Sequence, residues 1–251
     1  MPFDSAQGPQ YITMILFTIA KKEFREFFYS PIAYVFLTVF LVLVFWVFFS
    51  SFFIQNQASL RVFFSWIPVI FVVFLPAVTM GKWAEEKKSG TFELLLTLPV
   101  TDFQAVMGKF LSCLYFVMVA LIFTLPLVGT VWFLGDLDLG PVFCGYVGLV
   151  LLAAASIAVG LYLSSLTQNS IVAFILSFLV LFVLHLLGES LVVNAAPQFL
   201  VPWFLGASLS NHFESISRGV LDSRDLFYYI SVTGFFLYLN VLSLESRGWD
   251  K

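Results

Sequence analysis

The chain has 251 residues, of which 61% are hydrophobic and 11% charged, and its formal net charge at pH 7 is −3. Soluble domains are about half apolar and about a quarter charged, so a chain with a mean hydropathy of +1.00 has too much apolar surface for a soluble globule. The composition also excludes intrinsic disorder, and the acidic balance argues against nucleic acid as a partner. The remaining class is an all-α membrane protein with little room for a soluble domain.

The N-terminal residues before the first long apolar run predict an amphipathic helix over 11–29, which ends at Ser30-Pro31. Its apolar positions recur at helical spacing, and basic side chains take the other face. The apolar face comprises Phe17, Ala20, Phe24, Phe27 and Phe28, and the polar face comprises Thr18, Lys21, Lys22, Arg25 and Glu26. We expect this helix to lie in the cytoplasmic interface of the membrane. The alternative is a polar lead-in to the first span.

Charge-free segments predict six membrane-spanning helices. A helix needs about 20 apolar residues to cross the hydrocarbon core, and the shorter charge-free runs fit one crossing each. The long run 139–188 holds two crossings, divided at the polar cluster 164–170. The predicted spans are about 31–53, 62–81, 110–134, 141–163, 171–188 and 226–244.

The loop 82–109 after the second span, KWAEEKKSGTFELLLTLPVTDFQAVMGK, has an ordered pattern. A charge cluster over 85–88 is followed by a Ser-Gly break and a short amphipathic helix over 91–97, which Pro99 stops. Thr101 and Gln104 form a capping-box signature, so a new helix starts there and runs into the third span. We expect the short helix to lie parallel to the membrane and to contact a cytoplasmic partner. The alternative is an amphipathic turn that rests on lipid headgroups.

The charge-free run 190–213 is predicted not to cross the membrane. Pro197 and Pro202 divide it into pieces that are too short for a crossing, so we expect a re-entrant hairpin of short helices on the outer side. A seventh span is the alternative. With six spans, nine of the twelve basic residues fall on one side, in the N-terminal segment, the loop 82–109 and the C-terminal tail. Because Lys and Arg are enriched in cytoplasmic loops, both termini are predicted to be cytoplasmic. The predicted organisation is therefore a cytoplasmic segment 1–30, a six-span domain 31–245 and a cytoplasmic tail 246–251.

Residue patterns for catalysis, cofactors and metals are missing. His185 and His212 have no partners at metal-ligand spacing, and His185 is expected to form a local hydrogen bond with Glu189. Cys113 and Cys144 lie in apolar runs and are expected to be buried thiols. Lys82 and Lys109 each follow a Met-Gly pair but lack the P-loop context, so we expect them to snorkel at the ends of the spans. Hence no catalytic, cofactor-binding or metal site is predicted, and a stand-alone membrane enzyme is disfavoured.

Two segments resemble the ABC-2 type permeases. These are EEKKSGTFELLLTLPVTDFQAVMGKF at 85–110 and HFESISRGVLDSRDLFYYISVTGFFLYLNVLSLESRGW at 212–249. The chain is similar over essentially its whole length to permeases associated with gliding motility and with nitrous-oxide-reductase maturation. The resemblance implies a dimer of six-span subunits in a bacterial inner membrane, with two separate ATPase subunits that bind ATP and Mg²⁺. It also implies an elbow helix at 11–29, a coupling helix at 91–98 and an external hairpin at 190–213.

The leading hypothesis is a transport permease driven by a partner ATPase. The alternative is a membrane subunit that uses the ATPase stroke to act on a periplasmic or membrane-anchored auxiliary protein, without moving a substrate. The residues expected to couple to the ATPase are Glu85, Glu86, Lys87, Ser89, Gly90, Thr91, Phe92, Glu93, Leu94, Leu95, Leu96 and Pro99. The residues expected to form an external lid or partner contact are Asn194, Pro197, Pro202, Glu214, Arg218 and Asp222.

Overall fold

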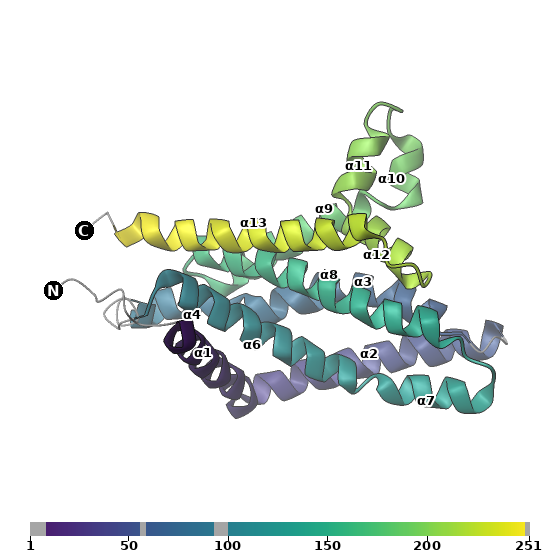
Figure 1. Ribbon diagram of the computed structural model, residues 1–251, viewed down its shortest axis with the longest axis horizontal. Coiled ribbons are helices and arrows are strands. Elements are labelled where there is room, and N and C mark those ends of the chain that lie inside the picture. Colours follow the sequence, from purple (N-terminus) through teal and green to yellow (C-terminus); the bar gives the residue numbers. More distant parts are fainter. Residues whose placement is uncertain (1–8, 56–58, 93–99, 249–251) are drawn as a thin grey trace.

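The computed structural model describes residues 9–55, 59–92 and 100–248, which form an elongated helical bundle without a strand (Figure 1). The helices in chain order are α1 (Pro9–Tyr29), α2 (Pro31–Gln55), α3 (Arg61–Thr79), α4 (Gly81–Ser89), α6 (Asp102–Ile122), α7 (Leu125–Leu134), α8 (Leu139–Leu166), α9 (Ser170–Leu186), α10 (Ser190–Ala195), α11 (Val201–Ala207), α12 (Leu209–Ser217) and α13 (Ser223–Gly248).

Five helical segments of the described chain are long and apolar enough to cross a membrane. They are Ala33–Phe52, Arg61–Ser89, Asp102–Leu134, Leu139–Leu166 and Ser223–Glu245. The helix α9 coincides with the predicted fifth span, but its 17 residues make it shorter than the other five. The chain is thus an all-α membrane protein, and the count of six crossings stays a prediction.

The predicted third span differs most from the structure. Its helix starts at Asp102, after the predicted Thr101 cap, and it consists of two helices, α6 and α7, instead of one. Pro126 has no N–H to continue the helical ladder at this point. The Thr124 hydroxyl occupies the break, donating to the Leu121 carbonyl at 2.6 Å and sharing a hydrogen bond with the Tyr146 hydroxyl at 2.9 Å. The break between α8 and α9 falls at 167–169, within the predicted polar cluster.

The helix α8 forms the centre of the bundle, where it packs against α3, α4, α6, α9, α12 and α13. Glycines on α8 allow these close approaches. A Cβ added at Gly145 would lie 2.5 Å from the Phe64 ring, and one at Gly160 would lie 2.2 Å from the Thr79 hydroxyl. Small residues at helix contacts are typical of membrane bundles, because association there depends on close packing.

The helix α1 packs along α6 at the α4 end of the bundle, where α13 also ends (Figure 1). Its contact with α6 is close, because a Cβ added at Gly108 would lie 2.5 Å from the Ile19 Cγ2 methyl. The predicted helix over 11–29 is confirmed as a helix. Its position in a membrane interface stays a prediction.

The segment 190–217 is divided into short helices, as the two prolines predicted, but there are three of them instead of a pair. The helices α10 and α11 have no buried residue and project away from the bundle (Figure 1). By contrast, α12 buries Leu209, Phe213 and Ile216, and it packs mainly on α8 near Gly148. The hairpin is therefore attached to the bundle mainly through α12, and the Tyr228 hydroxyl of α13 adds a hydrogen bond to the Ala207 carbonyl at the end of α11 at 2.6 Å.

Candidate functional site: a buried charge network around α4

The helix α4 holds the charge cluster that the sequence singled out, and Gly90 ends it. Gly90 has a φ of 74°, the left-handed conformation that favours glycine at a helix C-terminus. The Ser89 hydroxyl donates to the Glu85 carbonyl at 2.9 Å and is hydrogen-bonded to the Thr91 hydroxyl at 2.9 Å. The predicted Ser-Gly break is therefore confirmed. The residues Glu93, Leu94, Leu95, Leu96 and Pro99, with most of the predicted coupling helix, lie outside the described residues.

The joint between α3 and α4 is filled by a side chain from α8. The Ser164 hydroxyl donates to the Met80 carbonyl at 2.8 Å and accepts from the backbone N–H groups of Trp83 and Ala84 at 3.2 and 3.3 Å. In an unbroken helix the Met80 carbonyl would accept from the Ala84 N–H. Ser164 thus bridges a missing rung of the ladder, which is a recognised cause of a helix bend.

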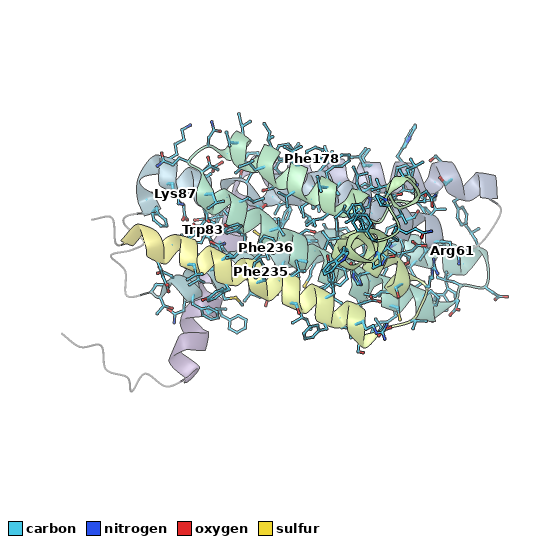
Figure 2. The ribbon with its side chains drawn as sticks, turned by 90° about the horizontal axis from the view of Figure 1, so that it is seen from above. Arg61, Trp83, Lys87, Phe178, Phe235 and Phe236 are labelled. Atoms are coloured by element: carbon cyan, nitrogen blue, oxygen red, sulfur yellow. The ribbon has the colours of Figure 1, made fainter. Side chains whose placement is uncertain are left out.

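Two further contacts attach α4 to α8 and α9. The Lys87 ammonium donates to the Ser165 carbonyl, and the Ser170 hydroxyl donates to the Glu85 carboxylate at 3.4 Å. Trp83 and Lys87 lie near one end of the bundle, and Arg61 lies toward the other (Figure 2). The α4 helix is therefore fixed by polar contacts to the helices on one side.

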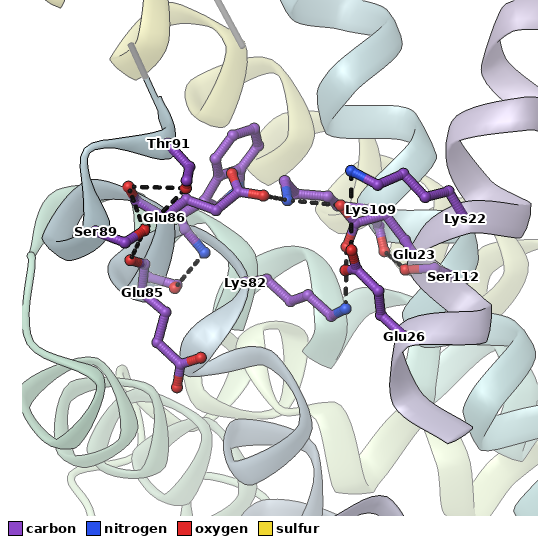
Figure 3. A network of polar contacts seen from close by, with 12 residues as sticks. Lys22, Glu23, Glu26, Lys82, Glu85, Glu86, Ser89, Thr91, Lys109 and Ser112 are labelled. Atoms are coloured by element: carbon purple, nitrogen blue, oxygen red, sulfur yellow. Dashed lines mark hydrogen bonds and ion pairs between the residues drawn. The ribbon is translucent and has the colours of Figure 1, made fainter. Parts of the chain in front are cut away.

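On its other side, α4 joins a buried charge network with α1 and α6 (Figure 3). The two carboxylate oxygens of Glu23 accept from different lysines, Oε1 from Lys109 and Oε2 from Lys82, each at 3.0 Å. Lys109 also pairs with Glu86 at 2.5 Å. Two carboxylates and two ammonium groups balance in charge, so the network carries no uncompensated charge among its four members.

The network is shielded from water. The side chains of Lys109 and Glu23 are 2% and 6% exposed. Aromatic faces cover both cations, with the Lys82 ammonium 3.8 Å from the Phe27 ring centroid and the Lys109 ammonium 4.8 Å from that of Trp83. The expectation that Lys82 and Lys109 snorkel at span ends is wrong, because Glu23 and Glu86 supply buried counter-charges inside the bundle.

Burial alone would raise the pKa of the Glu23 carboxyl, because it disfavours the charged form. The ammonium groups of Lys109 and Lys82 and their hydrogen bonds outweigh burial, and they hold the pKa below its ordinary value. Glu23 is therefore ionised at neutral pH.

Phe92 and Trp83 form an aromatic contact beside the network. Phe92 is 9% exposed, and its ring meets Trp83 edge to face with a centroid distance of 6.1 Å. Its ring thus belongs to the core of the chain and not to an exposed knob. Within the part of the chain that the structure describes, Trp83 Nε1 and Glu86 Oε2 are buried without a hydrogen-bond partner.

The sequence predicted the start of α6 correctly. The Gln104 backbone N–H donates to the Thr101 hydroxyl at 3.3 Å, and the Thr101 N–H donates to the Gln104 side-chain oxygen at 3.0 Å, which completes the capping box. Because α6 starts at this cap, Lys109 comes two turns later and faces Glu23.

The predicted external residues lie on the hairpin and just after it. Asn194, Pro197 and Pro202 are exposed on or beside α10 and α11. Glu214 and Arg218 form an exposed ion pair at 2.6 Å on α12. Asp222 accepts from the Arg224 N–H at 3.0 Å, before the first turns of α13. The structure does not gather these residues into one cluster of contacts.

A second polar cluster, which sequence reasoning missed, joins the hairpin to α13. His212 Nδ1 lies 2.7 Å from Asp225 Oδ1, and its Nε2 lies 3.3 Å from the Gly206 carbonyl. The Tyr228 ring stacks on His212 with a centroid distance of 4.0 Å. His185, by contrast, has the predicted local partner, because its Nε2 lies 3.5 Å from Glu189 Oε1. Cys113 and Cys144 are free and buried, as expected.

Sequence reasoning also missed Glu23 and Ser164. A signal for Glu23 was present, because it lies three residues after Ala20 and four before Phe27, within the apolar face of α1. A carboxylate on an apolar face requires a partner, and the repeated Met-Gly-Lys at 80–82 and 107–109 supplies two lysines. Ser164 had no such signal, because its partners are backbone groups of a distant helix.

The network contains no nucleophile beside a general base, so its chemistry is structural and electrostatic. No curated protein matches the chain. A family model described as ABC-2 family transporter protein matches residues 54–218, which run from the end of α2 to the end of the hairpin. Because this match covers more than half of the chain, the protein belongs to the ABC-2 transporter family.

Proposed function

We propose that this membrane-embedded permease subunit is driven by separate ATPase subunits that dock at the segment 85–102. Family membership makes the chain the permease component of an ABC transporter. The observation that supports this docking site is the position of α4, which is the one described segment with polar contacts to α1 and α6 on one side and to α8 and α9 on the other. A force applied there reaches most of the bundle.

The proposed topology has six spans, with α9 as the fifth and both termini in the cytoplasm. The basic helix α1, the charge cluster of α4 and the start of α6 lie at one end of the bundle, while Arg61 lies toward the other (Figures 1 and 2). This distribution is what the cytoplasmic preference of Lys and Arg predicts. A reporter that is active only in the periplasm should stay silent at residue 251 and should be active at 137 and 215. Activity at 251 contradicts the topology.

Docking is tested by purification of the complex with its ATPase. We expect Leu95→Ala or Glu93→Ala to weaken recovery of the ATPase, since truncation of an interface anchor costs about 1–4 kcal/mol of binding. Asp136→Asn is the control, because Asp136 is exposed on the loop between α7 and α8. Phe92→Ala is unsuitable as a docking variant, because its ring packs inside the chain. Full recovery of ATPase with both Leu95→Ala and Glu93→Ala contradicts the docking site.

The second candidate function is mechanical action on an outer partner, with no substrate crossing. The hairpin supports it, since α10 and α11 bury nothing and Leu191, Phe199 and Trp203 are 73–83% exposed. Large exposed apolar side chains mark partner or lipid contacts. Photo-crosslinking from position 203 should capture a second copy or an auxiliary protein. Crosslinks to lipid alone remove this candidate.

A further inference from the structure

We propose that Glu23 is a positioning residue that ties α1 to α4 and α6, so that these three helices transmit the ATPase stroke as one rigid body. The inference rests on the proposed function of the 85–102 segment. It adds a residue outside that segment, in a helix that the predicted coupling set did not include.

Glu23 places a buried carboxylate between α4 and α6. A buried ion pair is poor evidence for stability, because hydrophobic residues of similar volume often replace it without loss. A better-attested role of buried polar groups is to specify one arrangement of helices. Glu23 is suited to this role, because each of its oxygens binds a lysine from a different helix.

The four charges of the network are connected in series. Glu86 of α4 pairs with Lys109 of α6, which pairs with Glu23 of α1, which pairs with Lys82 of α4. The contacts start and end on α4, so three ion pairs of alternating charge link α4 to both α1 and α6 (Figure 3). A movement of α4 alone would separate two ion pairs, each of which includes a side chain that is at most 6% exposed.

The packing around the charge network adds a second restraint. The helix α1 lies close to α6 where Gly108, one residue before Lys109, meets Ile19, four residues before Glu23. The Lys82 ammonium also lies 3.8 Å from the centroid of the Phe27 ring of α1. Tight packing restrains α1 against α6, and the Glu23 carboxylate extends that restraint to α4.

The test separates a positioning role from a merely stabilising one. Glu23→Gln leaves Lys82 without a counter-charge, so this variant can lose both stability and coupling. Glu23→Gln combined with Lys82→Met restores charge balance, because Lys109 keeps Glu86. Each variant is purified with its ATPase and reconstituted in phospholipid nanodiscs, and two quantities are measured: the ATPase recovered and the stimulation of ATP hydrolysis by the permease.

We expect the double variant to fold and to bind the ATPase, yet to lose about threefold or more of the stimulation, a change within the range of known coupling mutations. The control is Glu26→Gln on the same helix, because Glu26 pairs with Lys22 at 3.8 Å in an exposed position. If the double variant shows wild-type stimulation, Glu23 only stabilises the fold and the proposal is wrong.

A second experiment does not depend on the stability of these variants. Ile19→Cys together with Gly108→Cys removes the Ile19 methyl and places two thiols at this close contact of α1 and α6. Because α1 and α6 move together in the proposal, a disulfide between these thiols should leave the stimulation unchanged. Loss of stimulation on oxidation that dithiothreitol reverses shows that α1 must move separately, and overturns the proposal. A wild-type chain that fails to bind any ATPase contradicts the proposed function instead.

Discussion

The α4 end of the bundle and the hairpin of α10, α11 and α12 are built on different principles. At the α4 end, two carboxylates and two ammonium groups from three helices form three ion pairs, and Lys109 and Glu23 are almost fully buried. The hairpin exposes most of α10 and α11. It is held by the apolar face of α12 and by contacts to α13, in which His212 pairs with Asp225 and the Tyr228 and Tyr229 hydroxyls donate to the Ala207 and Leu209 carbonyls. The first region ties three helices together through buried charges, whereas α10 and α11 bury no residue.

This difference indicates where each region can act. A segment that receives force from a soluble subunit needs rigid attachment to the membrane helices, and the charge network provides it. A segment that meets an outer partner needs exposed surface and few internal restraints, because parts of low local stability are those that move. A substitution that breaks one contact in either region should therefore have an effect that stays within that region.

Lys109→Met should have the largest effect, since it leaves the buried Glu23 with Lys82 alone and removes the ion-pair partner of the partly buried Glu86. Breaking a buried ion pair by removing one partner costs about 3–5 kcal/mol. Unfolding in detergent micelles, followed by circular dichroism, should show this loss. The matched control is Lys22→Met on α1, where the side chain is 72% exposed and no measurable change is expected. Equal stability of the two variants would falsify the buried network.

Acidification should weaken the α4 end of the bundle, because it protonates Glu23. The folded pKa of Glu23 lies below its ordinary value of 4.5, so its stabilising contribution is complete above that pH and is lost as the pH falls through the lowered value. The midpoint temperature of thermal unfolding should therefore fall more steeply below pH 4.5 for the wild type than for Glu23→Gln. Parallel pH profiles of the two proteins would show that Glu23 does not titrate differently on unfolding.

Gly108→Ala should separate α1 from α6. The new methyl would lie 2.5 Å from Ile19 Cγ2, and overpacking of this kind costs about 1–3 kcal/mol. Ile19→Ala removes the opposing methyl and should restore part of the loss in the double variant, as measured by denaturant unfolding. Gly129→Ala is the control, since an added Cβ there meets nothing within 4 Å. Additive losses in the double variant would contradict a direct contact.

His212→Gln should loosen the hairpin and leave the α4 end unchanged. It removes the partner of the buried Asp225, and an unsatisfied buried acceptor costs about 1–3 kcal/mol. Hydrogen exchange should become faster in α11 and α12, with no change in α1, α4 and α6. A uniform increase through all helices would show that the two regions are not independent.

Glu214→Gln should have the smallest effect. Its pair with Arg218 is exposed on both sides, and such pairs contribute below about 1 kcal/mol. Stability and hairpin exchange should match the wild type, while binding of an outer partner is the one measurement expected to change. A loss of stability as large as that of Lys109→Met would contradict the contrast between the two regions.

Local signals in the sequence predicted many element boundaries, because the groups that create them are close in the chain. These signals act within a few residues, and they are the capping box at Thr101, the break at Ser89-Gly90 and the prolines at 197 and 202. The break at Phe123–Thr124 was missed, although Pro126 marked it. The long apolar runs hid it, since hydropathy identifies a span without showing whether its helix is continuous.

The class of the protein, most of its apolar helices and the family resemblance were determined by the sequence alone, because composition and short-range patterns carry them. The partners of buried polar groups were decided only by the tertiary structure. Glu23 and Lys109 are far apart in the chain, as are Ser164 and Met80, and each pair meets because small residues let helices approach closely. Hydropathy places Lys82 and Lys109 at the ends of spans. In the folded chain they are buried ion-pair partners, because α1 packs the Glu23 carboxylate against them.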